Sequence, residues 1–563
     1  MRCRIAVLSL ALAACTSLHA GDDALTLLQA ARIHTQDPAR PTVQAMVWDA
    51  RGAIVATGDA RALQAQYPDA RRIDAGAATV VPGLIDAHAH IVGLGQALTR
   101  ADLVGTRNMA EVIERLRAFE KTLADDAWLL GGGWDQNHWP GKAFPSVADL
   151  DEAFPDRPVW LSRVDGHAAW ANSAALRAAA QDPDSARWLA SGQPDGGQII
   201  RDADGKPTGV FIDLAERVVS VVVPAATQAS RDDALERALA MSVRQGLTGV
   251  HDMGTSQQDF LQLRRFADEG RLPLRVSAYA DGENEALAWL CANGPYQHAD
   301  GRLQMRGLKL LIDGALGSRG AAMIEDYSDD PGNRGLLIVD ETNYERIVRK
   351  GDACKLQVAT HAIGDRGNRI VLDTYARVLG DRARSDHRWR IEHAQIVALD
   401  DIPRFAALKV TASMQPTHAT SDMPWAQDRV GPVRIAGAYA WRRFAEQGVA
   451  LALGSDFPVE SPDPRLGLRA AVTRQDGEGR PAGGWLPDQV LTPAEALRGF
   501  TADAAWANRD EARVGRLAVG LRADFVILDA DPLTIAPSAL DDLVVRSTWV
   551  DGKAVYDAET EAQ

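Results

Sequence analysis

The sequence predicts an α/β fold in which most of the chain forms a parallel barrel of βα units. From about residue 307 to residue 460, short apolar runs alternate with helical segments, which is the pattern of βα units around a parallel sheet. In addition, four apolar strands end in His or Asp residues. Functional side chains of a TIM-like barrel come from the carboxyl ends of its strands, so the two observations support one another.

The composition indicates an ordinary globular protein with more than one domain. The chain has 563 residues, of which 46% are hydrophobic and 24% are charged, which is enough for a large core. The formal net charge is −15, with 61 Lys and Arg against 76 Asp and Glu. Because no basic block interrupts this acidic balance, we expect no nucleic-acid partner.

The first twenty residues have the features of a secretory signal, with Arg2 and Arg4 before an apolar run and small residues after it. We therefore expect export. Cleavage after Ala20 would release an ordinary mature chain. The segment Leu12-Ala13-Ala14-Cys15 instead resembles the bacterial lipobox, whose Cys carries lipid. We favour this second interpretation, which anchors the protein to a membrane in the periplasm.

Both chain ends are expected to be rich in strands. Residues 25–80 and 490–556 contain alternating apolar runs separated by turns, and we predict that they pair into one composite β-sandwich. Residues 81–489 then form the barrel. The stretch between Trp128 and Pro224 has no regular βα period, so residues around 136–225 are interpreted as an insertion that covers one mouth of the barrel.

Individual helices and strands can be followed along the chain. Ser230 is expected to cap a helix before a strand at 249–251, and Thr342 with Glu345 has the capping-box pattern for the helix before a strand at 356–361. Later strands are expected at 389–393, 410–415 and 449–454. Thr492 with Glu495 is a second capping box.

Two cysteines of the expected mature chain lie far apart in the sequence. Cys291 and Cys354 have no C-x-x-C spacing, and we expect both to be buried free thiols.

Candidate metal ligands stand at the strand ends. The run from Val80 ends in His88-Ala89-His90. Residues i and i+2 of a strand point to the same side, so both imidazoles can bind one metal ion. Three further strand ends carry His361, His393 and Asp456. These ends meet at one face of a parallel barrel, and we expect the side chains to share a site.

The motifs resemble the amidohydrolase superfamily of metal-dependent (β/α)8-barrel hydrolases. Within it, the chain is similar to the amidohydrolase 3 branch and to N-substituted formamide deformylases. The resemblance covers nearly the whole mature chain. Its motifs are Pro82 to His90, Gly131 to Asp135, Asp165 to His167, Trp170 to Ser173, Lys206 to Gly209, Gly307 to Gly314, Thr360 to Asp365, Glu392 to Gln395 and Gly454 to Asp456.

This resemblance implies one or two divalent metal ions, with Zn²⁺ the first choice for imidazole and carboxylate donors. The implied ligands of one ion are His88, His90 and Asp456, those of a second are His361 and His393, and Lys309 takes the place of an N-carboxylated lysine that bridges both. Metal ions lower the pKa of a bound water from about 15.7 towards 7. Asp456 would accept the proton of that water and pass it to the leaving nitrogen.

Two weaker candidates complete the predicted site. His418, just past the strand at 410–415, and His167, from the insertion, are expected to contact the substrate. His251 is left outside the site, because more strands are expected ahead of Lys309 than the barrel needs. The predicted function is hydrolysis of a carbon–nitrogen bond in a small amide or formamide-like molecule.

Two alternatives to this function stay open. The export signal and 14 Trp residues would also suit a periplasmic ligand-binding lipoprotein, although such a protein has no need of a metal-ligand set. The same fold also supports hydrolysis of lactones, cyclic amides and phosphotriesters, so the ligand residues do not define the bond that is cleaved.

Overall fold

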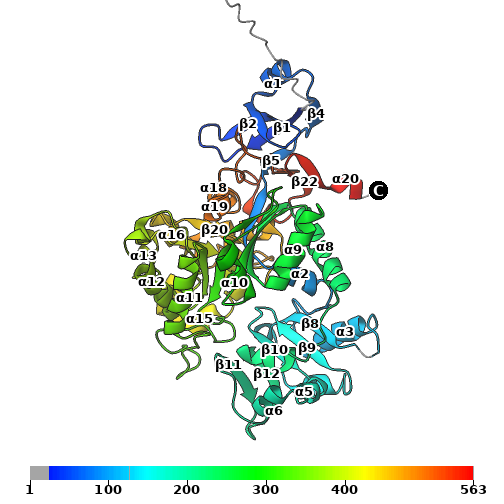
Figure 1. The fold of residues 1–563 in the computed structure, drawn as a ribbon, viewed down its shortest axis with the longest axis vertical. Helices are drawn as coiled ribbons and strands as arrows, with labels where there is room; N and C mark the ends of the chain where they lie inside the picture. The colour runs from blue at the N-terminus through cyan, green and yellow to red at the C-terminus, as the bar shows by residue number, and fades with distance from the viewer. Residues whose placement is uncertain (1–24, 126, 562–563) are drawn as a thin grey trace, which may run out of the picture.

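The computed structural model describes residues 25–125 and 127–561 of the chain. The expected signal and Cys15 lie outside these residues, so lipidation and cleavage stay predictions. Among the described helices, none combines the length and apolar character that crossing a bilayer requires. Three sheets organise the fold, and Figure 1 shows the sheet from the chain ends at the top, the barrel in the middle and an inserted sheet below.

The barrel is built from parallel strands that pair in chain order. They are β6 (Leu84–Ala89), β13 (Leu247–Thr255), β14 (Arg275–Asp281), β16 (Leu303–Leu311), β17 (Gln357–Ala362), β18 (Arg390–His393), β19 (Thr411–Met414) and β20 (Leu451–Leu453). The segment after β20 returns to β6, since the N–H of Asp456 donates to the carbonyl of His88 at 2.7 Å. The predicted (β/α)8 barrel is confirmed.

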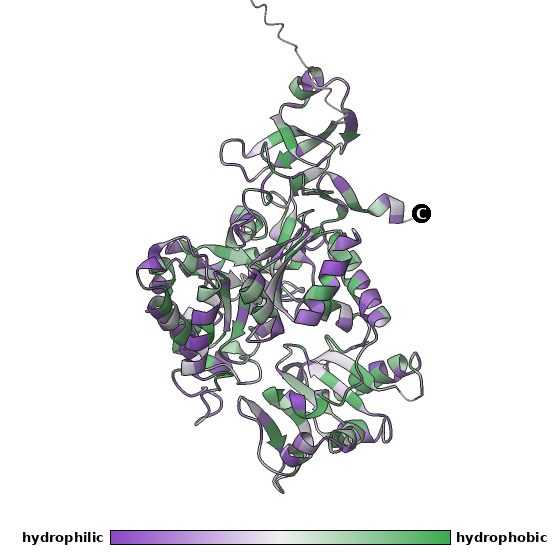
Figure 2. Cartoon of the chain, in the orientation of Figure 1, coloured by the Kyte–Doolittle hydropathy of each residue, from purple (hydrophilic) through white to green (hydrophobic). Residues whose placement is uncertain are grey.

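The barrel strands are buried on both faces. Every residue of β6, β17 and β18 is buried. Strands covered on both sides have nearly continuous apolar sequences instead of alternating ones, which is why the sequence shows them as runs. Figure 2 shows these strands within a ring of helices that carry many hydrophilic residues. The barrel thus forms a rigid base for the loops at its carboxyl end.

Helices connect the strands and cover the barrel. They include α2 (Ile91–Ala97), α8 (Gln228–Arg244), α9 (Gln257–Asp268), α10 (Glu285–Asn293), α11 (Glu341–Ala353), α12 (Asp365–Leu379), α13 (Ile402–Ala407), α14 (Pro416–Asp422), α15 (Ala426–Arg434), α16 (Trp441–Glu446), α17 (Pro464–Thr473), α18 (Pro493–Gly499) and α19 (Ala502–Ala507). The capping box predicted for Thr492 and Glu495 is confirmed at the start of α18.

Two other predicted helix caps are wrong. Helix α11 is capped by Asp340 instead of Thr342, and the Asp340 carboxylate accepts from the N–H of Asn343 at 3.0 Å. Helix α8 is capped by Thr227 instead of Ser230, and the Thr227 hydroxyl accepts from the N–H of Ser230 at 3.2 Å. In both cases an earlier side chain can satisfy the free N–H groups, so the helix begins sooner.

Both chain ends join in one sheet of eight strands. They are β1 (Thr26–His34), β2 (Thr42–Trp48), β3 (Ile54–Gly58), β4 (Arg71–Asp74), β5 (Thr79–Pro82), β21 (Phe525–Leu528), β22 (Val545–Val550) and β23 (Lys553–Asp557). The ends meet where β21 pairs antiparallel with β5. Strand β5 leads directly into β6, so this sheet fixes the position of the first barrel strand.

The inserted sheet spans residues 101–213 and begins before residue 136. Its strands are β7 (Ala101–Asp102), β8 (Leu129–Trp134), β9 (Val159–Arg163), β10 (Ala168–Ala171), β11 (Gly197–Arg201) and β12 (Pro207–Asp213). Strands β9, β10, β12 and β11 pair antiparallel, which explains why no βα period is visible there. Trp134 and Trp170 are buried in its own core.

Two expectations about the barrel are overturned. Cys291 in α10 and Cys354 at the end of α11 form a disulfide, so they are not free thiols. The barrel places consecutive βα units side by side and brings these distant cysteines together. The strand count that left His251 aside was also wrong: β13 is the second barrel strand, because the strands of residues 101–213 belong to the separate sheet.

Candidate metal centre

The six predicted ligands lie at the carboxyl end of the barrel. They are His88 on β6, His90 just after it, Lys309 on β16, His361 on β17, His393 on β18 and Asp456 after β20. All are buried except His90, whose side chain is 35% exposed. The parallel strands end at the same face, and this explains the convergence.

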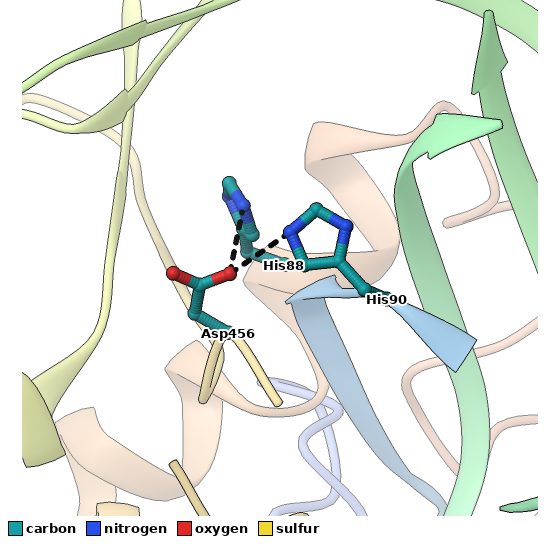
Figure 3. Close-up of side chains that lie close together, drawn as sticks. All are labelled: His88, His90 and Asp456. Carbon is teal, nitrogen blue, oxygen red and sulfur yellow. Dashed lines mark ion pairs between the residues drawn. The ribbon is translucent and has the colours of Figure 1, made fainter. Parts of the chain in front are cut away.

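Asp456 is the centre of the first group. Its Oδ1 lies 3.3 Å from Nε2 of His88 and 3.1 Å from Nε2 of His90, as Figure 3 shows. The three ligand atoms lie within 4.8 Å of one another, as the donors of one metal ion would.

Asp456 also belongs to a second group, with His393 and His418, whose ligand atoms again lie within 4.8 Å of one another. Oδ2 of Asp456 is 3.3 Å from Nε2 of His418. His361 is close to this group, with its ring 4.5 Å from that of His393 between centroids. Its Nε2, however, lies 3.4 Å from the carbonyl oxygen of Gly314. The structure therefore places His418 next to the predicted ligands His393 and Asp456, with His361 beside them.

The donor set fits a metal ion. Nδ1 of His393 is buried without a hydrogen-bond partner within the described residues, and the buried Oδ1 of Asp456 has close to it only the ring nitrogens of His88 and His90, which are themselves candidate ligands. Leaving such atoms unpartnered is costly. Burial also lowers the pKa of His393 well below its ordinary value, and this keeps the imidazole neutral as a ligand must be. A cation between these nitrogens and the carboxylate would satisfy both atoms.

Glu392 hydrogen-bonds the ring of His88, and Arg390 hydrogen-bonds Glu392. Nδ1 of His88 lies 2.7 Å from Oε2 of Glu392, and the Arg390 guanidinium donates to both carboxylate oxygens of Glu392 at 2.7 and 3.0 Å. All three side chains are fully buried. Burial alone would raise the pKa of Glu392, but Arg390 and His88 lower it, so the carboxylate is ionised. The bond from Nδ1–H leaves Nε2 of His88 free as a ligand atom.

An unusual backbone lets adjacent residues face one site. Glu392 and His393 follow one another on β18 and would normally point to opposite faces. His393 has φ of 71° and Ala394 has φ of 42°, in the left-handed region that residues other than glycine rarely adopt. As a result Glu392 contacts His88 by a hydrogen bond while the His393 ring lies 4.7 Å from the His88 ring between centroids.

A family model matches most of the chain. The model described as "Amidohydrolase family" matches residues 71–556. The chain belongs to the amidohydrolase family. Among its relatives is YtcJ of Bacillus subtilis (strain 168), whose name describes it as an amidohydrolase, with 33% identity over 90% of this chain and 94% of that protein. The N-substituted formamide deformylase of Arthrobacter pascens is 28% identical over 94% of this chain and 97% of that protein.

Solved structures agree with the fold of this amidohydrolase. An uncharacterized metal-dependent hydrolase from Pyrococcus horikoshii OT3 matches with a TM-score of 0.74 and 28% identity, covering 91% of this chain and 99% of that one. The family and this likeness support hydrolysis of carbon–nitrogen bonds by this amidohydrolase.

His418 is held between two carboxylates of the amidohydrolase. Nδ1 lies 3.2 Å from Glu460 Oε1 and Nε2 lies 3.3 Å from Asp456 Oδ2. Burial would lower the pKa of His418, but these hydrogen bonds raise it to about 10. His418 thus contacts Asp456 directly, and the predicted contact with substrate would need one of these bonds to open.

His167 reaches the same site from the inserted sheet. Its ring lies 5.1 Å from that of His361 between centroids, and Nδ1 is 2.7 Å from Oδ1 of Asp213 at the end of β12. Asp213, Glu392 and Arg390 are not among the site residues predicted from the sequence. A usable signal existed for two of them, because Arg390 and Glu392 are charged residues at i and i+2 of a strand that is otherwise buried.

Proposed function

We propose that this amidohydrolase is exported and hydrolyses an amide or formamide-like carbon–nitrogen bond in a small molecule. The observation that carries the proposal is the position of Asp456, whose two oxygens face His88, His90 and His418 at the carboxyl end of the barrel. The relative from Arthrobacter pascens that is named an N-substituted formamide deformylase supports the choice of bond.

The metal ions are proposed to be one or two, with zinc preferred because the donors are imidazole nitrogens and carboxylate oxygens. His88, His90, His361, His393, Lys309 and Asp456 are the proposed ligands. When bound, a divalent ion lowers the pKa of water and polarises the carbonyl of the substrate.

The remaining chemistry is assigned to side chains of this chain. Asp456 accepts a proton from the attacking water and transfers it to the leaving nitrogen. His418 and His167 hold the substrate. Glu392 orients His88, since it accepts the Nδ1 proton.

Lys309 is proposed to carry a carboxyl group on its amine. Nζ is buried, lies 3.3 Å from His88 Nε2 and has no carboxylate at ion-pair distance among the described residues. A buried ammonium without a partner is costly, whereas a carbamate would supply oxygen donors. Lys309→Ala should cut activity sharply, and short carboxylates should restore part of it. Full activity of that variant would rule out the modification as a functional element.

Export is supported by the disulfide between Cys291 and Cys354, because disulfides persist mainly in oxidising compartments. The lipobox at Cys15 would anchor the exported protein.

The test of the proposed function combines metal analysis with a substrate screen. Protein purified without chelator should contain one to two equivalents of transition metal. The double variant His88→Ala/His90→Ala should lose most of it, whereas His34→Ala/His298→Ala, which removes two histidines paired with carboxylates elsewhere, should keep it. Unchanged metal in the first variant would reject the site.

The screen should contain formamides, N-acyl amino acids, cyclic amides, lactones and phosphotriesters. Amide or formamide turnover by metal-loaded protein is the expected result. Turnover of only a lactone or phosphotriester would assign a different bond. Ligand binding without turnover would favour the binding-protein alternative.

A further inference from the structure

The end of β12 and the loop after β16 meet beside the metal centre. Asp213, the last residue of β12, hydrogen-bonds the His167 imidazole at 2.7 Å. The side chain of Asp213 is 2% exposed and that of His167 is 15% exposed. The His167 ring contacts His361. The Asp213 carboxylate, which belongs to the insertion, therefore hydrogen-bonds the His167 imidazole close to the candidate metal ligand His361.

The second oxygen of Asp213 is enclosed by two glycines, Gly314 and Gly320, which we call the glycine slot. A Cβ atom on Gly314 would lie 2.9 Å from Oδ2 of Asp213, and one on Gly320 would lie 3.1 Å from it. Oδ2 is buried and lacks a hydrogen-bond partner among the described residues. Because Gly314 and Gly320 have no side chains, there is space between them for the Asp213 carboxylate.

Asp213 also has a strained backbone. Its φ is 50° and its ψ is −126°, a combination that is strained for any residue other than glycine. Its N–H donates to the carbonyl of His167 at 3.1 Å. A glycine would adopt this backbone without strain. The carboxylate must therefore supply something that glycine cannot.

Two arginines also lie where the insertion meets the barrel. Arg163 of β9 lies against Gly317, where a Cβ atom would be 3.1 Å from Nη1. Arg429 of α15 donates to Oδ1 of Asn137 in the insertion at 3.0 Å. The insertion therefore contacts the barrel at residues other than His167 and Asp213.

We propose that Asp213 is a positioning residue which, seated in the glycine slot, holds His167 at the metal centre so that its Nε2 faces the amide substrate and hydrogen-bonds its amide group. The Nδ1–H of His167 donates to Asp213, and this leaves Nε2 free for the substrate. Nε2 has no hydrogen-bond partner within the described residues. This inference rests on the proposed function and assigns the inserted sheet a part in it.

Kinetics test the role of Asp213. We would measure kcat, KM and metal content for Asp213→Asn and Asp213→Gly with N-butylformamide as the probe. The control is Asp202→Asn, which changes an exposed turn carboxylate just before β12. The expected result is a kcat at least about 10-fold lower in both Asp213 variants, with metal content retained and the control unchanged. Asp213→Gly should unfold at the same or a higher temperature, because it relieves strain.

Chemical rescue tests the role of His167. His167→Ala should lose turnover with metal retained, and added imidazole should restore part of it because the cavity can accept the missing ring. A purely structural role would give no rescue and would lower the unfolding temperature instead. Normal turnover of N-butylformamide by His167→Ala would overturn the proposal.

Hydrogen exchange separates this inference from the proposed function. In Asp213→Gly, amides of residues 163–167 and 314–320 should exchange faster than in wild type, while Asp202→Asn leaves them unchanged. Unchanged exchange, or wild-type kcat in Asp213→Asn, would overturn the inference. If wild type hydrolyses no amide, the proposed function fails, and the substrate contact of His167 fails with it. The exchange result then still decides whether Asp213 locks the insertion to the barrel.

Discussion

Asp456 combines two chemical tasks that one substitution can separate. It faces three imidazoles, and although burial alone would raise its pKa, His88, His418 and His90 lower it well below the ordinary value. The ionised carboxylate is therefore available as an oxygen donor. A proton carrier needs an acidic group, whereas a ligand needs only an oxygen.

We predict that Asp456→Asn keeps much of its metal but loses turnover by about 10²-fold or more, the usual scale of general acid–base catalysis. An amide retains a carbonyl oxygen but cannot carry the proton. Metal content and kcat measured on the same preparation check this. Near-normal turnover on an amide between pH 6 and 9 would exclude the proton-carrier role and direct attention to His418.

The Glu392 carboxylate is expected to tune the metal site without touching the metal. Glu392→Gln should weaken metal affinity by about 10–100-fold, because the amide is a poorer acceptor for the Nδ1 proton of His88 and leaves Arg390 without its counter-charge. Competition with a chelator measures the affinity. Glu283→Gln, which changes an exposed ion pair with Arg346 on the barrel exterior, is the control. Equal affinities in wild type and Glu392→Gln would show that Glu392 does not orient the ligand.

At the scale of helices and strands, the disulfide links α10 to the end of α11. The cysteines are 63 residues apart in the sequence. A cross-link across that distance reduces the entropy of the unfolded chain by an amount worth about 4 kcal/mol in the loop-closure description.

The double variant Cys291→Ser/Cys354→Ser should therefore unfold at a lower urea concentration than wild type, with a loss of up to about 4 kcal/mol. Wild type treated with reductant should approach the variant, while the variant itself should not respond to reductant. Identical unfolding midpoints for wild type and variant would show that the bond adds no stability.

For the whole molecule, location is the property to test. After cell fractionation, the full-length protein should be found with the membranes. Cys15→Ser should release it from the membranes or block removal of its signal. The Cys291–Cys354 bond should be formed in the exported protein and absent when the signal is deleted, because the cytoplasm reduces disulfides. A soluble periplasmic product beginning at Gly21 would show ordinary signal cleavage instead.

The sequence by itself determined the features that depend on residues close together along the chain, namely which segments form strands and helices. Buried strands appear as apolar runs and helices as spaced apolar positions, so the barrel and its strand ends could be predicted. The five ligand candidates His88, His90, His361, His393 and Asp456 followed, because each stands where an apolar run stops. Helix starts were less certain, since more than one nearby residue could cap α8 and α11.

Only the tertiary structure decided which distant residues meet. Glu392 and His88 are 304 residues apart, yet barrel closure puts them 2.7 Å from each other. Cys291 and Cys354 are joined because α10 and α11 cover neighbouring strands. Asp213 meets Gly314 and Gly320 because the insertion docks on the barrel mouth. Periodicity along a chain reports which face of an element is buried, but it carries no record of the partner, which is set by how the sheets close and pack.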